Sequence, residues 1–167
     1  MIIKYPNPIL RKKAKNIEQI TPEIKKLAQK MTKLMIDRQG AGLAANQVGG
    51  LKRIITYIDN DKAKILINPE IIRKSTAIIE SEEGCLSFPN LYGLVVRSAK
   101  IQVKAKNQFG KNLNFKAENI LAVIIQHEID HLDGILFIDK VKPNTLRHTE
   151  ETEKQKNESE SFPSGKN

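Results

Sequence analysis

The chain contains one cysteine, no tryptophan and no long apolar run. Because Cys85 is alone, an internal disulfide is excluded, and the residue is either a buried apolar filler or a chemically active thiol. No stretch approaches the roughly 18 apolar residues that a membrane span needs. The opening MIIKYPNPILRKKAKNI has neither the apolar segment nor the cleavage site of a signal peptide, and it is not Arg- and Ser-rich. We therefore expect a protein of the bacterial cytoplasm with no membrane partner.

Aromatic residues make up only 5% of the chain, and acidic residues are outnumbered by basic ones, for a formal net charge of +9. Residues 149–167 carry five Glu and three Lys, so residues 1–148 carry a net +11. A basic body favours polyanionic surroundings such as nucleic acid or the ribosome surface. The lysines are spread along the sequence without stacking aromatic residues between them, which indicates no specific nucleic-acid recognition.

The length of 167 residues suits one hydrophobic core and is too short for two comfortable domains. After Pro143 the chain becomes polar and low in hydrophobicity. The sequence therefore predicts a single globular domain over residues 1–148 and a polar, flexible tail over residues 149–167.

Two segments have the apolar periodicity of helices. The first begins at Thr21-Pro22, a hydroxyl cap followed by proline, and should stop at Gly40. The second, AENILAVIIQHEIDHLDG, is apolar nearly all round over residues 120–125 and should be a buried central helix. Gly134 fits the position just after its last turn.

Between the two helical segments the pattern is one of short strands. They are predicted at 53–58, 64–67, 70–80, 94–106 and 112–117, with turns at DND, INP, FPN and NQFGK. The fold class predicted is therefore α+β, with antiparallel sheets packed around the second helix and with an N-terminal helix.

The second helix carries a metal-binding pattern, HExxH. Successive helical residues turn by about 100°, so His127 and His131 differ by only about 40° and share one face. In such motifs the two imidazoles hold a metal ion, and a glutamate, here Glu128, accepts a proton from the water that the metal activates. Because the preceding turns are apolar, a surface location of these polar groups is disfavoured.

The third metal ligand is not expected in the sequence after this helix. The extended zincin pattern places a histidine at position 137, where this chain has Phe137. The downstream glutamates lie in or near the polar tail, which is a poor place for a ligand that must be held within a few tenths of an ångström. Upstream, SEEGCLSFPN offers Cys85, and a thiolate is a strong ligand for soft or borderline metals. Two imidazoles and one thiolate leave an open position, which is typical of a catalytic site.

At this point the chain resembles a known family. GAGLAANQ (40–47), EGCLS (83–87) and QHEIDH (126–131) are similar to the three motifs of peptide deformylase, and the likeness extends over roughly residues 4–141. The resemblance implies removal of the N-formyl group from the initiator methionine of newly synthesised polypeptides, so the expected partners are N-formylmethionyl nascent peptides. It also implies one Fe2+ ion per chain, for which Zn2+, Ni2+ or Co2+ can substitute.

Matching the motifs assigns a role to each residue of the site. The metal ligands are Cys85, His127 and His131, and Glu128 is the general base and then the acid that protonates the departing amine. Gln47 and the backbone N–H of Leu86 stabilise the oxyanion. These roles agree with the chemistry of the groups, because a carboxamide does not titrate and can donate at any working pH.

Small residues are expected to admit an extended substrate. Ala41 and Gly42 on one side, and Gly84 opposite, would pair their backbones with a peptide. Val123 and Ile124 lie one turn before His127, where they would line an apolar pocket for a methionine side chain as well as belonging to the core.

Two features depart from the family pattern. Val96 stands where proline often precedes Arg97, and we expect Arg97 to pair with Glu83 and support the Cys85 strand. The polar tail lacks the long basic helix that some members use to contact the ribosome. Two alternatives to a deformylase remain at this stage: a zincin-type zinc peptidase with a tail glutamate as ligand, and a basic ribosome- or RNA-binding module with a structural metal.

Overall fold

The computed structural model describes residues 1–149, so the predicted tail lies outside the described residues apart from Thr149. The α+β class is confirmed: two α-helices accompany two antiparallel sheets in this part of the chain. The helices are α1 (Pro22–Asp37) and α2 (Asn119–Leu132). The strands are β1 (Gly42–Ala44), β2 (Ile54–Asp59), β3 (Lys62–Lys74), β4 (Ile78–Cys85), β5 (Phe88–Ser98), β6 (Lys100–Lys106), β7 (Asn112–Glu118) and β8 (Arg147–His148). Neither of the described helices is long and apolar enough to cross a membrane.

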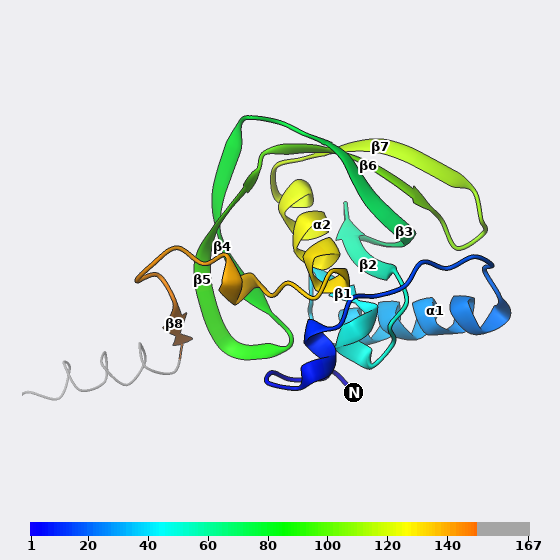
Figure 1. Cartoon of the computed structure of the whole chain (residues 1–167), viewed down its shortest axis with the longest axis horizontal. Coiled ribbons are helices and arrows are strands. Elements are labelled where there is room, and N and C mark those ends of the chain that lie inside the picture. The colour runs from blue at the N-terminus through cyan, green and yellow to red at the C-terminus, as the bar shows by residue number, and fades with distance from the viewer. Residues whose placement is uncertain (150–167) are drawn as a thin grey trace, which may run out of the picture.

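The two sheets enclose α2. The larger sheet has the strand order β1-β2-β3-β6-β7, and the smaller has the order β4-β5-β8. Figure 1 shows α2, in yellow, in the hollow between the curved larger sheet and the β4–β5 pair, with α1 along the lower edge. β1 and β4 are therefore edge strands, and each presents an unpaired backbone edge.

α1 forms where its sequence predicts. The Thr21 hydroxyl accepts a hydrogen bond from the N–H of Ile24, and proline occupies the first turn. Met31 and Met35 are fully buried in the core. The helix ends at Asp37, three residues before the predicted stop, because Gln39 already takes a left-handed conformation (φ 54°).

The predicted strands at 64–67 and 70–80 are wrong in their division. β3 runs without a break from Lys62 to Lys74, and INP is a bulge within it, not a turn. Asn68 takes the left-handed conformation there (φ 50°), and its side chain bonds both the N–H and the carbonyl of Ile17 at 2.8 Å. These tertiary bonds stabilise a bend that local propensity interprets as a chain reversal.

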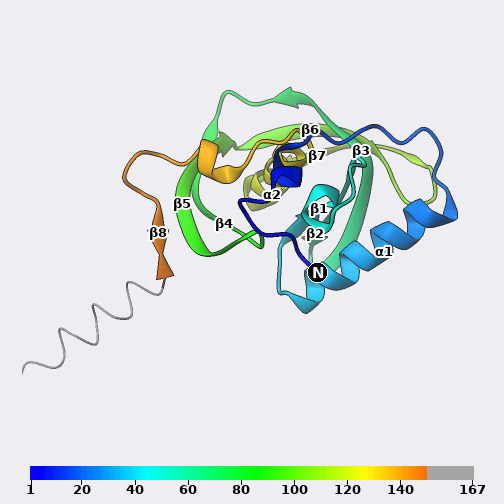
Figure 2. The same cartoon turned by 60° about the horizontal axis from the view of Figure 1, so that its bottom comes forward.

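The predicted strand at 94–106 is also wrong, since it contains two strands of different sheets. β5 ends at Ser98 and β6 begins at Lys100, so the chain changes sheet at Ala99. Figure 2 shows β4 and β5 on the side of the molecule away from α1. The predicted FPN turn lies inside β5, and the reversal falls instead at Leu86–Ser87, immediately after Cys85.

α2 is buried along most of its length, with 9 of its 14 residues buried. It contacts the larger sheet through β1, β2 and β7 and the smaller sheet through β5. Gly134 follows its end with φ 75°, as predicted, and a Cβ there would lie 2.8 Å from the carbonyl carbon of Arg11. Glycine at this position therefore ends the helix and lets the N-terminal segment cross over it.

Candidate metal and catalytic site

Three side chains from two elements converge beside α2. Cys85 ends β4, and His127 and His131 lie one turn apart on α2. One donor atom from each lies within 4.8 Å of the other two. The Nε2 atom of His131 is 3.2 Å from the Cys85 Sγ, and the two imidazole centroids are 5.0 Å apart. The structure thus brings together the three ligands predicted from the sequence.

His127 is held from behind by a carboxylate. Its Nδ1 lies 2.8 Å from Glu83 Oε2, so its Nε2 is left for the cluster. Arg97 grips the same carboxylate with two bonds, Nε to Oε1 at 2.7 Å and an Nη to Oε2 at 2.9 Å, and also donates to Asp130. The predicted Arg97–Glu83 pair is therefore confirmed with Val96 in place. Such a carboxylate behind a histidine fixes the ring orientation and the tautomer.

The network shifts the protonation of its members. Burial opposes ionisation of Glu83, but hydrogen bonds from Arg97 and His127 outweigh it and lower its pKa to about 2. Burial also opposes the charge on His127, yet its bonds with Cys85 and Glu83 raise its pKa above the usual value. The pKa of His131 is lowered, first by burial and then by repulsion from His127. A neutral His131 is the form that binds a metal.

Glu128 faces the cluster from the same helix. Its Oε2 is buried and accepts no hydrogen bond from the described residues. Burial raises the pKa of this carboxyl to about 7. A dication at the neighbouring ligands would favour the ionised form, which is the form that can accept a proton.

Gln47 is oriented by its own turn. Its Oε1 accepts a hydrogen bond from the Ala44 N–H at 2.8 Å, so its amide nitrogen points at the cluster. That nitrogen lies 3.3 Å from Cys85 Sγ and 3.2 Å from Ser87 Oγ. Leu86 lies beside it in the β4–β5 turn, between Cys85 and Ser87. Gln47 can therefore donate into the space beside the thiol without any rearrangement.

A cleft of about 620 Å³ opens over the site. It runs between the edge strands β1 and β4, with the exposed side of α2 as its floor. Ala41, Gly42 and Gly84, which the sequence singled out, line its two walls, and Val123 and Ile124 line its floor. The remaining predicted residues Gln47, Cys85, Leu86, His127 and Glu128 also line it, while His131 is buried behind them. An extended chain could pair with either backbone edge.

The comparisons with known proteins agree with this geometry. The family model described as Polypeptide deformylase matches residues 1–147. The chain belongs to this family. A peptide deformylase of Halothermothrix orenii is 48% identical over 142 residues, covering 84% of this chain and 92% of its own. That of Desulforudis audaxviator is 46% identical over 140 residues, covering 83% and 91%.

Solved deformylase structures share the fold as well. The crystal structure of peptide deformylase from Thermotoga maritima superposes with a TM-score of 0.84 at 37% identity, covering 86% of this chain and 97% of that one. The enzyme from Synechococcus elongatus, in complex with actinonin, gives a TM-score of 0.83 at 35% identity, covering 86% and 79%. The chain is thus a metal-dependent hydrolase that removes the N-formyl group from newly synthesised polypeptides, and the peptidase and RNA-module alternatives are wrong.

The deformylase site fits a metal ion on two grounds. Its donor set of one thiol and two imidazoles suits borderline divalent metals, and the donor atoms are close enough to share one ion. In addition, the buried Glu128 Oε2 has no hydrogen-bond partner among the described residues, which is costly unless a polar group comes to it.

Sequence reasoning missed contacts of three residues of the deformylase site, Glu83, Ser87 and Phe137. Glu83 was expected to bind Arg97 but not His127. Ser87 was not singled out, although its N–H lies 3.4 Å from Cys85 Sγ and its hydroxyl meets Gln47. Phe137, considered only as the residue that replaces a histidine, stacks on the His127 ring with centroids 6.1 Å apart. The only sequence signal for this contact was that an apolar residue, Phe137, lies six positions after His131.

The Glu83 network should make the metal-free deformylase sensitive to acid. Since the pKa of Glu83 is lower in the folded state than in the unfolded chain, its contribution is present above the unfolded value and lost as pH falls toward 2. The full contribution is about 3 kcal/mol, of which about 2 kcal/mol should be gone by pH 3. Urea unfolding between pH 6 and pH 3 measures it.

Glu83→Gln should reduce the pH dependence of the unfolding free energy by that amount. Glu82→Gln is the matched control, because Glu82 is the neighbouring glutamate but binds Arg147 at the surface. If the unfolding free energy fell equally between pH 6 and pH 3 in wild type and in Glu83→Gln, Glu83 would not be the group responsible for the acid sensitivity.

Gly42 should be indispensable because the Glu128 carboxylate lies against it. A Cβ at this position would fall 2.7 Å from Glu128 Cγ and 2.8 Å from Cδ. Gly42→Ala should displace the carboxylate and lower kcat roughly 100-fold, since a displacement of about 1 Å can have that effect, with metal content unchanged. Gly50→Ala is the control, because its Cβ would meet nothing closer than 3.4 Å. Equal kcat in both variants would contradict the placement of Glu128.

Proposed function

We propose that residues 1–148 form one catalytic domain in which Cys85, His127 and His131 hold a single Fe2+ ion, with Zn2+, Ni2+ or Co2+ able to replace it. The observation that carries this proposal is the meeting of the three donor atoms within 4.8 Å, behind a cleft. When bound, the ion supplies Lewis-acid activation of water. α2 is then the central scaffold of the site, because it carries two ligands and Glu128.

Glu128 moves the protons of the reaction. Its carboxylate lies against Gly42, and its buried Oε2 is not engaged with any described group. It accepts the proton of the attacking water and later gives it to the nitrogen of the departing amine. Formate and a free N-terminal amine are the products. The same carboxyl therefore acts first as base and then as acid.

Gln47 and the Leu86 N–H stabilise the negative charge that develops on the formyl oxygen. Gln47 is held ready, because its Oε1 is already bound to Ala44 and its Nε2 faces the cluster. A donor fixed in advance needs no reorganisation as the charge develops. Leu86 lies in the turn directly after the thiol ligand, where its backbone can reach the same oxygen.

The substrate is bound as an extended strand. Its backbone pairs with Ala41 and Gly42 at the start of β1, and with Gly84 on β4 opposite. The methionine side chain packs against Val123 and Ile124, which form the apolar floor of the cleft. Because the recognised features are the formyl group, the first side chain and the backbone, many nascent chains can be accepted.

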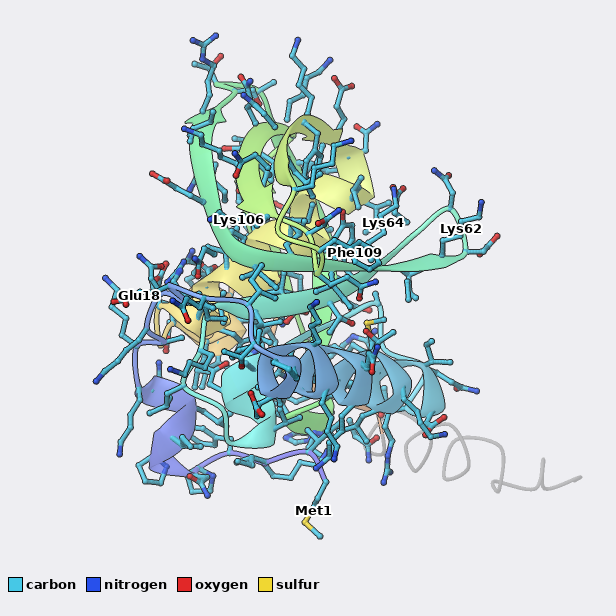
Figure 3. The ribbon with its side chains drawn as sticks, turned by 90° about the vertical axis from the view of Figure 1, so that its right-hand side faces the viewer. Met1, Glu18, Lys62, Lys64, Lys106 and Phe109 are labelled. Atoms are coloured by element: carbon cyan, nitrogen blue, oxygen red, sulfur yellow. The ribbon has the colours of Figure 1, made fainter. Side chains whose placement is uncertain are left out.

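The enzyme would meet these chains in the bacterial cytoplasm, where formylated polypeptides are made, and at the ribosome surface. The charge supports contact with the ribosome surface, since residues 1–148 carry a net +11. Figure 3 shows Lys62 near the end of the β2–β3 hairpin, which extends clear of the body, and Lys64 nearer the body. Contacts of this kind are electrostatic, weaken with salt and carry no sequence preference.

Formate release from a formyl-Met peptide tests the proposal. Anaerobically purified protein loaded with Fe2+ should remove the formyl group from the peptide. This activity should disappear after chelation and return on adding Fe2+. A variant with Gln at all five tail glutamates should keep both metal and activity. Failure of the iron-loaded wild type would overturn the proposed site chemistry, and metal loss in the tail variant would reassign the third ligand.

A further inference from the structure

Asn46 is a fully buried polar residue that touches a metal ligand from outside the cluster. It lies in the short turn after β1, with no exposed surface. Its Nδ2 donates a hydrogen bond to the backbone carbonyl of His131. Because a carbonyl can only accept, the amide must present its nitrogen there, and this fixes which way the side chain points.

The other end of the amide is left with an unused acceptor. Asn46 Oδ1 is buried and receives no hydrogen bond from residues 1–149. Leaving a buried amide oxygen without a hydrogen-bond partner is unfavourable. In native structures such atoms are hydrogen-bonded to protein groups or to ordered water. The residue therefore needs a donor close to His131.

His131 carries the complementary atom. Its Nε2 faces Cys85 Sγ at 3.2 Å, so this is the nitrogen that would bind the ion. A neutral imidazole that ligates through Nε2 bears its proton on Nδ1, which is then a donor. That Nδ1 is buried and also has no hydrogen-bond partner in the described part of the chain. His127 differs, because its Nδ1 is bound to Glu83.

We propose that Asn46 Oδ1 is the acceptor for His131 Nδ1–H, through one buried water molecule that both atoms bind. One unused acceptor and one unused donor, both buried, belong to two residues that are already hydrogen-bonded to each other. Such a bridge satisfies both atoms at once and is a normal role for buried water. Asn46 is thus a positioning residue for His131 and makes no contact with substrate.

The arrangement makes the two histidine ligands unequal. His127 is backed by the Glu83 carboxylate, whereas in the proposed bridge His131 is backed by a neutral amide that does not titrate. A carboxylate partner raises the basicity of its imidazole more than an amide does. The Asn46 bridge therefore fixes the orientation and tautomer of His131 without adding negative charge to the site.

Zinc affinity of purified protein, measured by chelator competition, tests the role. Asn46→Leu keeps the volume but removes both polar atoms, and its zinc dissociation constant should rise about 10- to 100-fold. Asn46→Thr restores one hydroxyl that can both donate and accept, and should recover most of the loss. The visible spectrum of the Co2+ form should change in Asn46→Leu and return in Asn46→Thr, because it reports the ligand geometry.

Thr56→Val is the matched control. Thr56 is equally buried, and its hydroxyl bonds Met35 Sδ at 3.1 Å, away from the cluster. Thr56→Val should lower the free energy of unfolding and leave the zinc dissociation constant unchanged. If Asn46→Leu loses stability but keeps wild-type zinc affinity and Co2+ spectrum, Asn46 is only structural and the proposal is overturned.

A measurement on the zinc-loaded wild type covers the case in which Asn46→Leu does not fold. Imidazole ¹⁵N NMR should show His131 protonated at Nδ1, with a slowly exchanging, hydrogen-bonded proton. A proton on Nδ1 that exchanges as fast as one on an exposed histidine would overturn the proposal.

Discussion

Glu128→Gln should lower kcat for formyl-Met peptides by about 10² to 10⁴-fold while metal content stays at the wild-type level. The substitution keeps the shape of the side chain and removes its capacity to accept a proton. Glu128 is not one of the three clustered donors, so the ion should remain. Its Oε2 is the buried atom that no described residue engages, which leaves no neighbour to take over the proton transfer.

Steady-state formate release and metal analysis on the same preparation check this result. Glu118→Gln is the control, because Glu118 precedes α2 but is half-exposed and pairs with Lys100. It should match wild type. A Glu128→Gln enzyme that retained more than about a tenth of the wild-type kcat would assign the proton transfer to another group.

Cys85→Ala should abolish metal binding at micromolar metal and, with it, activity. Loss of a group behind a ligand weakens affinity about 10- to 100-fold, and loss of the ligand itself should exceed that. Two imidazoles alone hold borderline metals more weakly than two imidazoles with a thiolate. Cys85 is half-buried and its Sγ contacts His131 and Gln47, so alanine leaves no substitute donor at that point.

Chelator competition with Zn2+ measures the affinity, and Ser87→Ala is the control. Ser87 lies two residues away, and its hydroxyl bonds Gln47 without belonging to the metal cluster. It should keep the ion and change kcat through Gln47. Full metal occupancy and full rate in Cys85→Ala would refute the proposed ligand set.

The helices were predictable because their signals are local. Thr21-Pro22 caps α1 by bonds within one turn, and Gly134 ends α2 because a left-handed residue is needed there. The pairing of His127 with His131 on one face follows from helical periodicity alone. Phe137 occupies the position of the third histidine in the extended zincin pattern, so that ligand is excluded and Cys85 is the upstream candidate. The structure places Cys85 beside both histidines.

The strands were predicted less well because sheet membership is not local. The segment 94–106 is continuous in its apolar pattern, yet its two halves belong to different sheets. INP has the composition of a turn, but the bonds of Asn68 to Ile17 make it a bulge. Both errors arise because the competing partner lies far away in sequence.

The sequence by itself determined the secondary-structure class, the helical pair of histidines and the candidate thiol, since each depends on residue type and short spacing. The tertiary structure decided what surrounds them. Glu83 behind His127, Asn46 on the backbone carbonyl of His131 and Gly42 against Glu128 are pairs of residues 44 to 86 positions apart in the sequence. Such contacts depend on how β1, β4 and α2 pack, and no local pattern encodes which buried donor meets which acceptor.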